Sequence, residues 1–134
     1  MKIGFDLDGT LDRVEIQNLA HALLLGGHRV YVLTGCFLEA GEWQNYEAKY
    51  EKLGRMGFAW EDQDGWKLQD NMFIEIFDAV DHKKFDRDYR LADIGLRKGD
   101  FIAREGIEIM FDDSELYVAM MPKMCGAQIV RVMP

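Results

Sequence analysis

The sequence predicts an α/β fold with a central, mainly parallel sheet, and two pairs of acidic residues at opposite ends of the chain are the main reason. Asp6 and Asp8 follow an apolar run at residues 1–5, and Asp112 and Asp113 follow a second apolar run near the other end. Short apolar runs of this kind are typical of buried parallel strands. Because the carboxyl ends of such strands meet in one crevice, we expect the four carboxylates to lie close together.

The first half of the chain alternates strand and helix patterns. Ile16, Leu19, Ala20, Leu23 and Leu24 recur at helical spacing and form a stripe that packs against the core. The expected elements are a strand over 1–5, a helix capped by Asp12 and ended by Gly26-Gly27, a strand over 28–33, and a charged helix from about Leu38 to Leu53.

The second half begins with a segment in which the helical periodicity fails. Residues 57–71 resemble a loop or small hairpin that turns at Asp64-Gly65, and a small lid is expected at about 56–72. The elements expected after it are a strand over 72–77, an irregular charged stretch over 81–90, a helix over 98–105 ended by Gly106, a strand over 107–111, a helix over 115–121 and a strand over 127–132.

Length and charge limit the classes of function. The chain of 134 residues has the length of one domain, and its 24 acidic and 16 basic residues give a net charge of -8. This charge argues against broad adhesion to nucleic acid or to an anionic membrane, and it gives no indication of a nucleic-acid end as partner, although such an end stays possible. No apolar run reaches spanning length, so we expect a cytoplasmic protein with Cys36 and Cys125 reduced. Nothing in the sequence indicates an oligomeric state.

The two acid pairs predict a metal site. Like charges brought close together repel unless a cation or a shared proton lies between them, and carboxylate oxygens are the ligands that Mg²⁺ prefers. The predicted ligands of Mg²⁺ are therefore Asp6, Asp8, Asp112 and Asp113. Two structural alternatives remain open: the first pair could serve as turn and cap residues, and the second could cap a helix together with Ser114.

Four motifs, in order, carry a resemblance to a known family. They are Asp6-Leu7-Asp8-Gly9-Thr10, Leu33-Thr34-Gly35, Lys98, and Phe111-Asp112-Asp113-Ser114. This set resembles the signature of the haloacid dehalogenase-like (HAD) hydrolase superfamily, in its small capless or minimally capped phosphatase type. The resemblance implies a single domain over 1–134 with a three-layer Rossmann-like fold. It also implies an Mg²⁺-dependent phosphatase that hydrolyses a phosphomonoester through an aspartyl-phosphate.

The same resemblance implies a role for each motif residue. Asp6 would be the nucleophile, and Asp8 would act as general acid and base while its backbone carbonyl joins the metal shell. Thr34 and Gly35 would bind the phosphoryl group, and Lys98 would neutralise its charge. The remaining pair completes the metal shell: Asp112 would bind Mg²⁺ directly, and Asp113 would bind through a water molecule or pair with the lysine.

Two other functions fit the same motifs: a non-catalytic module that binds phosphate and metal, and a phosphotransferase. The expected partner is a phosphorylated small molecule or nucleotide, with a nucleic-acid 3′-phosphate as a variant. Trp60 and Trp66 would either stack on a base or pack on the protein. The basic residues between His82 and Arg90 would either steer a phosphate or form a solvated surface.

Overall fold

The computed structural model describes residues 1–41 and 45–133, and its centre is a parallel sheet of five strands. The strands, in the spatial order β5-β2-β1-β6-β7, are β5 (Met72–Asp78), β2 (Arg29–Cys36), β1 (Lys2–Phe5), β6 (Ile109–Asp112) and β7 (Gln128–Arg131). Every neighbouring pair is parallel. The predicted parallel sheet is therefore confirmed, and its strands lie where the apolar runs predicted them.

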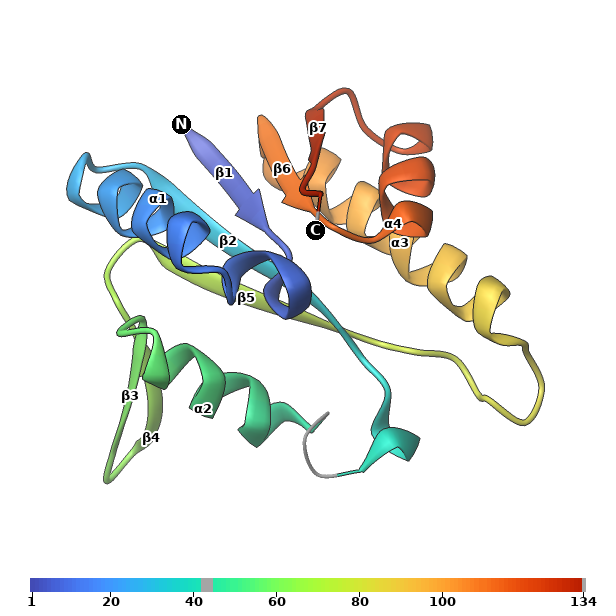
Figure 1. The fold of residues 1–134 in the computed structure, drawn as a ribbon, viewed down its shortest axis with the longest axis horizontal. Helices are drawn as coiled ribbons and strands as arrows, with labels where there is room; N and C mark the ends of the chain where they lie inside the picture. The colour runs from blue at the N-terminus through green and yellow to red at the C-terminus, as the bar shows by residue number, and fades with distance from the viewer. Residues whose placement is uncertain (42–44, 134) are drawn as a thin grey trace.

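Helices cover both faces of this sheet and make a three-layer α/β fold (Figure 1). They are α1 (Val14–Leu25), α2 (Tyr46–Arg55), α3 (Arg87–Glu105) and α4 (Glu115–Met120). Alternate residues of β2 belong to two separate cores: Val30 and Val32 pack with residues of α1 and α2, and Tyr31 and Leu33 pack with residues of α3 and α4. This alternation is what a strand buried on both faces requires.

Helix α3 is much longer than the sequence predicted. It begins at Arg87, inside the stretch expected to be irregular, because the Asp86 carboxylate accepts a hydrogen bond from the Tyr89 amide at 2.8 Å and caps the helix. Lys98 was predicted to open a helix and instead lies in the middle of this one. The buried residues of α3 are spaced so that they form one face of the helix: Arg90, Ile94, Gly95, Lys98, Gly99 and Ile102.

The other helices also differ from the prediction at their starts. Helix α1 begins at Val14 with Arg13 as its N-cap, because Asp12 instead accepts hydrogen bonds from the Gly9 amide and from Lys52. The helix predicted over 38–53 is a short turn at Leu38–Ala40 followed by α2. Positions 42–44 of that predicted helix lie outside the described residues.

A β-hairpin occupies the segment where a small lid was predicted. Strands β3 (Ala59–Asp62) and β4 (Gly65–Leu68) pair antiparallel, so the predicted turn at Asp64-Gly65 is confirmed. Trp66 stacks on Tyr50 of α2 with 5.9 Å between ring centroids and packs against the core. Figure 1 shows the hairpin beside the start of β5, away from the carboxyl ends of the strands. It therefore does not cover the edge where the acidic pairs lie.

None of the helices in the described ranges is long and apolar enough to span a lipid bilayer.

Close packing of α3 against α4 and the turn after it depends on small residues in α3, which gives a test of the fold. A Cβ added at Gly99 would lie 2.6 Å from the Met121 carbonyl oxygen, whereas a Cβ added at Gly54, near the end of α2, would meet its nearest atoms at 3.5 Å. We expect Gly99→Ala to lower the free energy of unfolding by about 1–3 kcal/mol through overpacking, although alanine favours helix. Gly54→Ala should raise it by up to about 1 kcal/mol. Urea unfolding of both variants measures these changes, and a stabilised Gly99→Ala protein would contradict this packing.

Candidate functional site

The carboxyl ends of β1 and β6 bring three of the predicted carboxylates together. The Asp6 amide donates a hydrogen bond to the Phe111 carbonyl at 2.9 Å, which aligns the ends of the two strands. One carboxylate oxygen from each of Asp6, Asp112 and Asp113 lies within 4.8 Å of the others. These three residues are therefore arranged as hard oxygen ligands around one point. The side chain of Asp8 is not part of this group.

Lys98 reaches this group from α3 and is completely buried. Its Nζ lies 2.9 Å from Asp6 Oδ1 and 3.1 Å from Asp112 Oδ2, and 4.1 Å from the centroid of the Tyr117 ring. Burial alone would lower the pKa of Lys98, but the carboxylates of Asp112 and Asp6 outweigh burial and raise it. Lys98 therefore stays charged and pairs with both acids.

Asp6 has the most perturbed environment of the acids at this edge. Burial raises the pKa of its carboxyl well above the ordinary value, the nearby Lys98 opposes that rise, and the charge of Asp112 adds to it. The ammonium of one lysine does not compensate fully for the acids around it. A further cation would stabilise the ionised form of Asp6.

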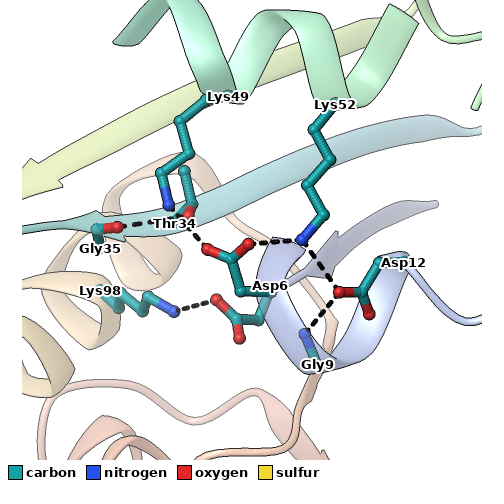
Figure 2. A network of polar contacts seen from close by, with 9 residues as sticks. Asp6, Gly9, Asp12, Thr34, Gly35, Lys49, Lys52 and Lys98 are labelled. Atoms are coloured by element: carbon teal, nitrogen blue, oxygen red, sulfur yellow. Dashed lines mark hydrogen bonds and ion pairs between the residues drawn. The ribbon is translucent and has the colours of Figure 1, made fainter. Parts of the chain in front are cut away.

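Asp8 has its own pair of lysines, which the sequence analysis did not identify. Lys49 Nζ lies 2.7 Å from Asp8 Oδ2, and Lys52 Nζ lies 2.6 Å from Asp8 Oδ1 and 3.0 Å from Asp12. Figure 2 shows both lysines descending from one helix toward this loop, opposite Lys98. Partial burial would raise the pKa of Asp8, but the hydrogen bonds from the two lysines outweigh it and lower the pKa. Asp8 is therefore ionised and held in ion pairs.

The spacing of Lys49 and Lys52 contained a signal that sequence reasoning missed. Two lysines three residues apart share one face of a helix. Lys49 is also only 2% exposed, which is unusual for a lysine without a charged partner. The pattern could be read in the sequence, but the partner on another element could not.

Gly9 lets the loop after β1 approach the loop after β6. Its φ of 83° lies in the left-handed region, and a Cβ at this position would lie 2.1 Å from Asp113 Oδ2. The hydroxyl of the next residue, Thr10, donates a hydrogen bond to Asp113 Oδ1 at 3.2 Å. Only glycine leaves room for Asp113 beside the first acidic loop.

Thr34 and Gly35 lie at this edge inside β2, which extends past the strand predicted over 28–33. Strand β2 continues to Cys36 because β5 pairs with it as far as Asp78. Thr34 is buried, and its hydroxyl lies 3.5 Å from the Gly35 carbonyl, which is long for a hydrogen bond. Among residues 1–41 and 45–133 this is the hydroxyl's one hydrogen bond. Cys36 is buried.

These residues surround a cavity of about 270 Å³, which we call the carboxyl-edge cavity. Its lining comes from four parts of the chain: Asp6, Asp8, Thr34, Gly35, Phe37, Arg87, Leu91, Asp113, Ser114 and Tyr117. Arg87 belongs to the basic stretch for which the sequence left open a role in steering a phosphate, whereas Tyr117 was not predicted as a site residue. Neither tryptophan of the hairpin lines this cavity, and Lys83 and Lys84 do not reach it.

Comparison with known proteins finds a likeness of fold. No family model matches the chain, and no curated protein matches it. Among solved structures it is similar to a universal stress protein in complex with cAMP, with a TM-score of 0.53 and 7% sequence identity over 99% of this chain and 96% of that chain. A likeness at this identity shows the α/β fold.

This result contradicts the predicted family. The similar solved structure described above is a universal stress protein and not a HAD hydrolase, and no family model supports the HAD resemblance. The predictions of a HAD-type phosphatase and of hydrolysis through an aspartyl-phosphate are therefore wrong. The physical reason is that acidic, hydroxyl and lysine side chains gather at the carboxyl edge of parallel sheets in many families, so short motifs there report topology more than chemistry.

The role of Lys98 as the buried counter-charge can be tested by stability. Lys98→Met leaves Asp6 and Asp112 facing each other without an ammonium, and we expect a loss of about 3–5 kcal/mol at neutral pH. The pKa of Asp6, already raised, rises further in the variant. Protonation then stabilises the folded state at low pH, and this contribution is lost as the pH rises through the folded pKa.

The destabilisation should therefore be smaller near pH 5 than near pH 8 when urea unfolding is measured at both values. Lys123→Met, at an exposed position, is the control and should change stability by less than about 0.5 kcal/mol. An equal cost of Lys98→Met at both pH values would contradict the pairing.

Proposed function

We propose that this chain is a binding domain for a phosphorylated small molecule of the nucleotide class, with Mg²⁺ beside the phosphate. The observation that carries the proposal is the composition of the carboxyl-edge cavity: a group of hard oxygen ligands, Asp6 and Asp113, lines the same space as a weakly bonded hydroxyl, that of Thr34. The first suits a divalent cation, and the second suits a phosphate oxygen.

The charge balance of the site supports a cation. The polar network holds five carboxylates and three ammonium groups: Asp6, Asp8, Asp12, Asp112 and Asp113 against Lys49, Lys52 and Lys98. Arg87 adds one guanidinium to the lining of the cavity, which still leaves an excess of negative charge. A phosphate would be repelled by this excess. Mg²⁺ held by Asp6, Asp112 and Asp113 would reverse the sign of this net charge. The charge of Asp8 is already balanced by its ion pairs with Lys49 and Lys52.

Two residues are suited to contact the phosphate itself. The Thr34 hydroxyl is buried near the carboxyl end of β2 and makes one long hydrogen bond among the described residues. The guanidinium of Arg87 is exposed and has no hydrogen-bond or ion-pair partner within residues 1–41 and 45–133. Gly35 leaves room for the Tyr117 side chain, since a Cβ there would lie 2.7 Å from the Tyr117 hydroxyl. Lys98 serves the carboxylates, since its ammonium is held between Asp6 and Asp112.

The comparison of structures supports the nucleotide class over other phosphorylated molecules. The similar universal stress protein was solved in complex with cAMP, a nucleotide. Parallel α/β sheets bind ligands in the crevice outside the carboxyl ends of the strands, which is where the carboxyl-edge cavity lies. Fold and site chemistry thus favour the same class of ligand.

Metal binding is tested with Mg²⁺ alone. We expect Asp113→Asn to weaken Mg²⁺ at least about tenfold in calorimetric titration, because it removes a charged ligand and not only an outer partner. Asp100→Asn is the control, since Asp100 pairs with Arg104 on the exposed side of α3. Affinity should also fall as the pH is lowered, because a proton competes for Asp6 with its raised pKa. Equal affinity of wild type and Asp113→Asn would contradict the site.

Nucleotide binding is tested by titration of adenosine 5′-monophosphate (AMP) and cAMP in the presence of Mg²⁺. Thr34→Val removes the hydroxyl while keeping the shape, and we expect affinity to fall about tenfold, the value of a hydrogen bond to a charged group. Thr34→Ser keeps the hydroxyl and should bind nearly as wild type. Failure of the wild-type protein to bind either nucleotide would overturn the proposal. So would release of inorganic phosphate from AMP, which would indicate turnover in place of binding.

A further inference from the structure

A second cavity adjoins the carboxyl-edge cavity. It has a volume of about 460 Å³ and is lined by Phe37, Glu39, Ala40, His82, Phe85, Asp86, Arg87, Arg90 and Leu91. Phe37, Arg87 and Leu91 line both cavities, so the two lie side by side. We call the second one the aromatic cavity, because it has two phenylalanines among its walls.

We propose that the aromatic cavity binds the planar base of the nucleotide whose phosphate lies in the carboxyl-edge cavity, an inference that rests on the proposed function. Ligand sites are typically concave, lined by apolar and aromatic groups, and fixed by a few polar groups. The two cavities divide these properties between them. The carboxyl-edge cavity holds the charged groups, and the aromatic cavity holds the rings.

The rings of the aromatic cavity are held in fixed orientations by their neighbours. Phe85 stacks on Tyr89 with 4.5 Å between centroids and 12° between planes, and 38% of Phe85 is exposed. The guanidinium of Arg90 lies 5.3 Å from the centroid of the Phe37 ring. A ring that is already supported on one side loses little conformational freedom when a base stacks on the other side. Such platforms are the usual means of holding a nucleobase.

Most charged groups of the aromatic cavity are paired within the protein. Arg90 forms an ion pair with Glu39 and donates a hydrogen bond to the Val80 carbonyl at 2.7 Å, while Asp86 caps α3. The cavity therefore presents rings and satisfied ion pairs to a ligand, which suits an uncharged base. Arg87 is the exception among the described lining residues. It lies where the cavities join, at the position that the sugar and phosphate of a nucleotide would occupy.

Another candidate for a base platform among the described residues, Trp60, belongs to a different part of the molecule. Trp60 is half-exposed and lines a cavity of about 510 Å³ with His21 and Asn71. This cavity shares no lining residue with the carboxyl-edge cavity. A single nucleotide whose phosphate lies near Thr34 therefore uses Phe85 and not Trp60.

The test compares a nucleotide with its base-free counterpart. AMP and ribose 5-phosphate share the sugar and the phosphate, so their difference in affinity reports the base alone. Calorimetric titrations with Mg²⁺ should give AMP an affinity at least about tenfold higher, the value of one stacking contact. Phe85→Ala should remove this advantage and leave the binding of ribose 5-phosphate unchanged. Arg87→Ala should weaken both ligands.

Matched controls lie elsewhere in the same fold. Phe73→Ala removes a comparable phenylalanine, 44% exposed and stacked on Tyr31, from the start of β5. Arg104→Ala removes an arginine from the far end of α3. Neither control should change the affinity for AMP. Circular dichroism of each variant confirms that it is folded.

The outcomes separate this inference from the proposed function. If AMP and ribose 5-phosphate bind wild type equally well, the base assignment is overturned and phosphate binding stands. If Phe85→Ala weakens both ligands alike, or neither, the base assignment is again overturned. If neither ligand binds wild type, the proposed function fails, and the base assignment fails with it.

Discussion

The buried ammonium of Lys98 is the interaction on which the arrangement of this molecule depends. It joins the end of β1, through Asp6, to the end of β6, through Asp112, and it does so from the middle of α3. One side chain thus fixes the first strand, β1, to two neighbouring elements near the other end of the chain, α3 and β6. Because burying unpaired charges is so costly, this cluster forms only when the sheet and the helix are both in register.

On the other side of the carboxyl-edge cavity, lysines of α2 form ion pairs with Asp8 in the same way. Lys49 and Lys52 reach Asp8 from α2, so each helical layer of the fold sends ammonium groups toward the loop that follows β1 (Figure 2). The central strand of the sheet therefore ends in a loop that both layers hold electrostatically. The carboxyl-edge cavity, with Thr34 in its lining, lies between these two walls. The positions of α2 and α3 therefore set its shape.

The sequence predicted the strands well because strands buried on both faces are short apolar runs, which are easy to recognise in a sequence. It also predicted that four carboxylates lie close together at one edge, and three of them, Asp6, Asp112 and Asp113, form such a group. It did not predict the first turns of α3, because their many charged residues gave no apolar helical pattern. It also did not predict the role of Lys49, whose partner, Asp8, lies on another element. The family prediction failed because several families share this topology and place similar polar residues at the ends of their strands.

The two walls of the crevice differ in their access to solvent. Lys98 and Asp112 are fully buried, whereas 45% of the Asp8 side chain is exposed. Dissolved ions screen exposed charges and hardly reach buried ones. Ionic strength therefore acts mainly on the wall that holds Asp8. In a concentrated salt solution the contact between α2 and the first loop weakens, while α3 keeps its hold on the strand ends, so the crevice has a rigid side and a side that responds to its medium.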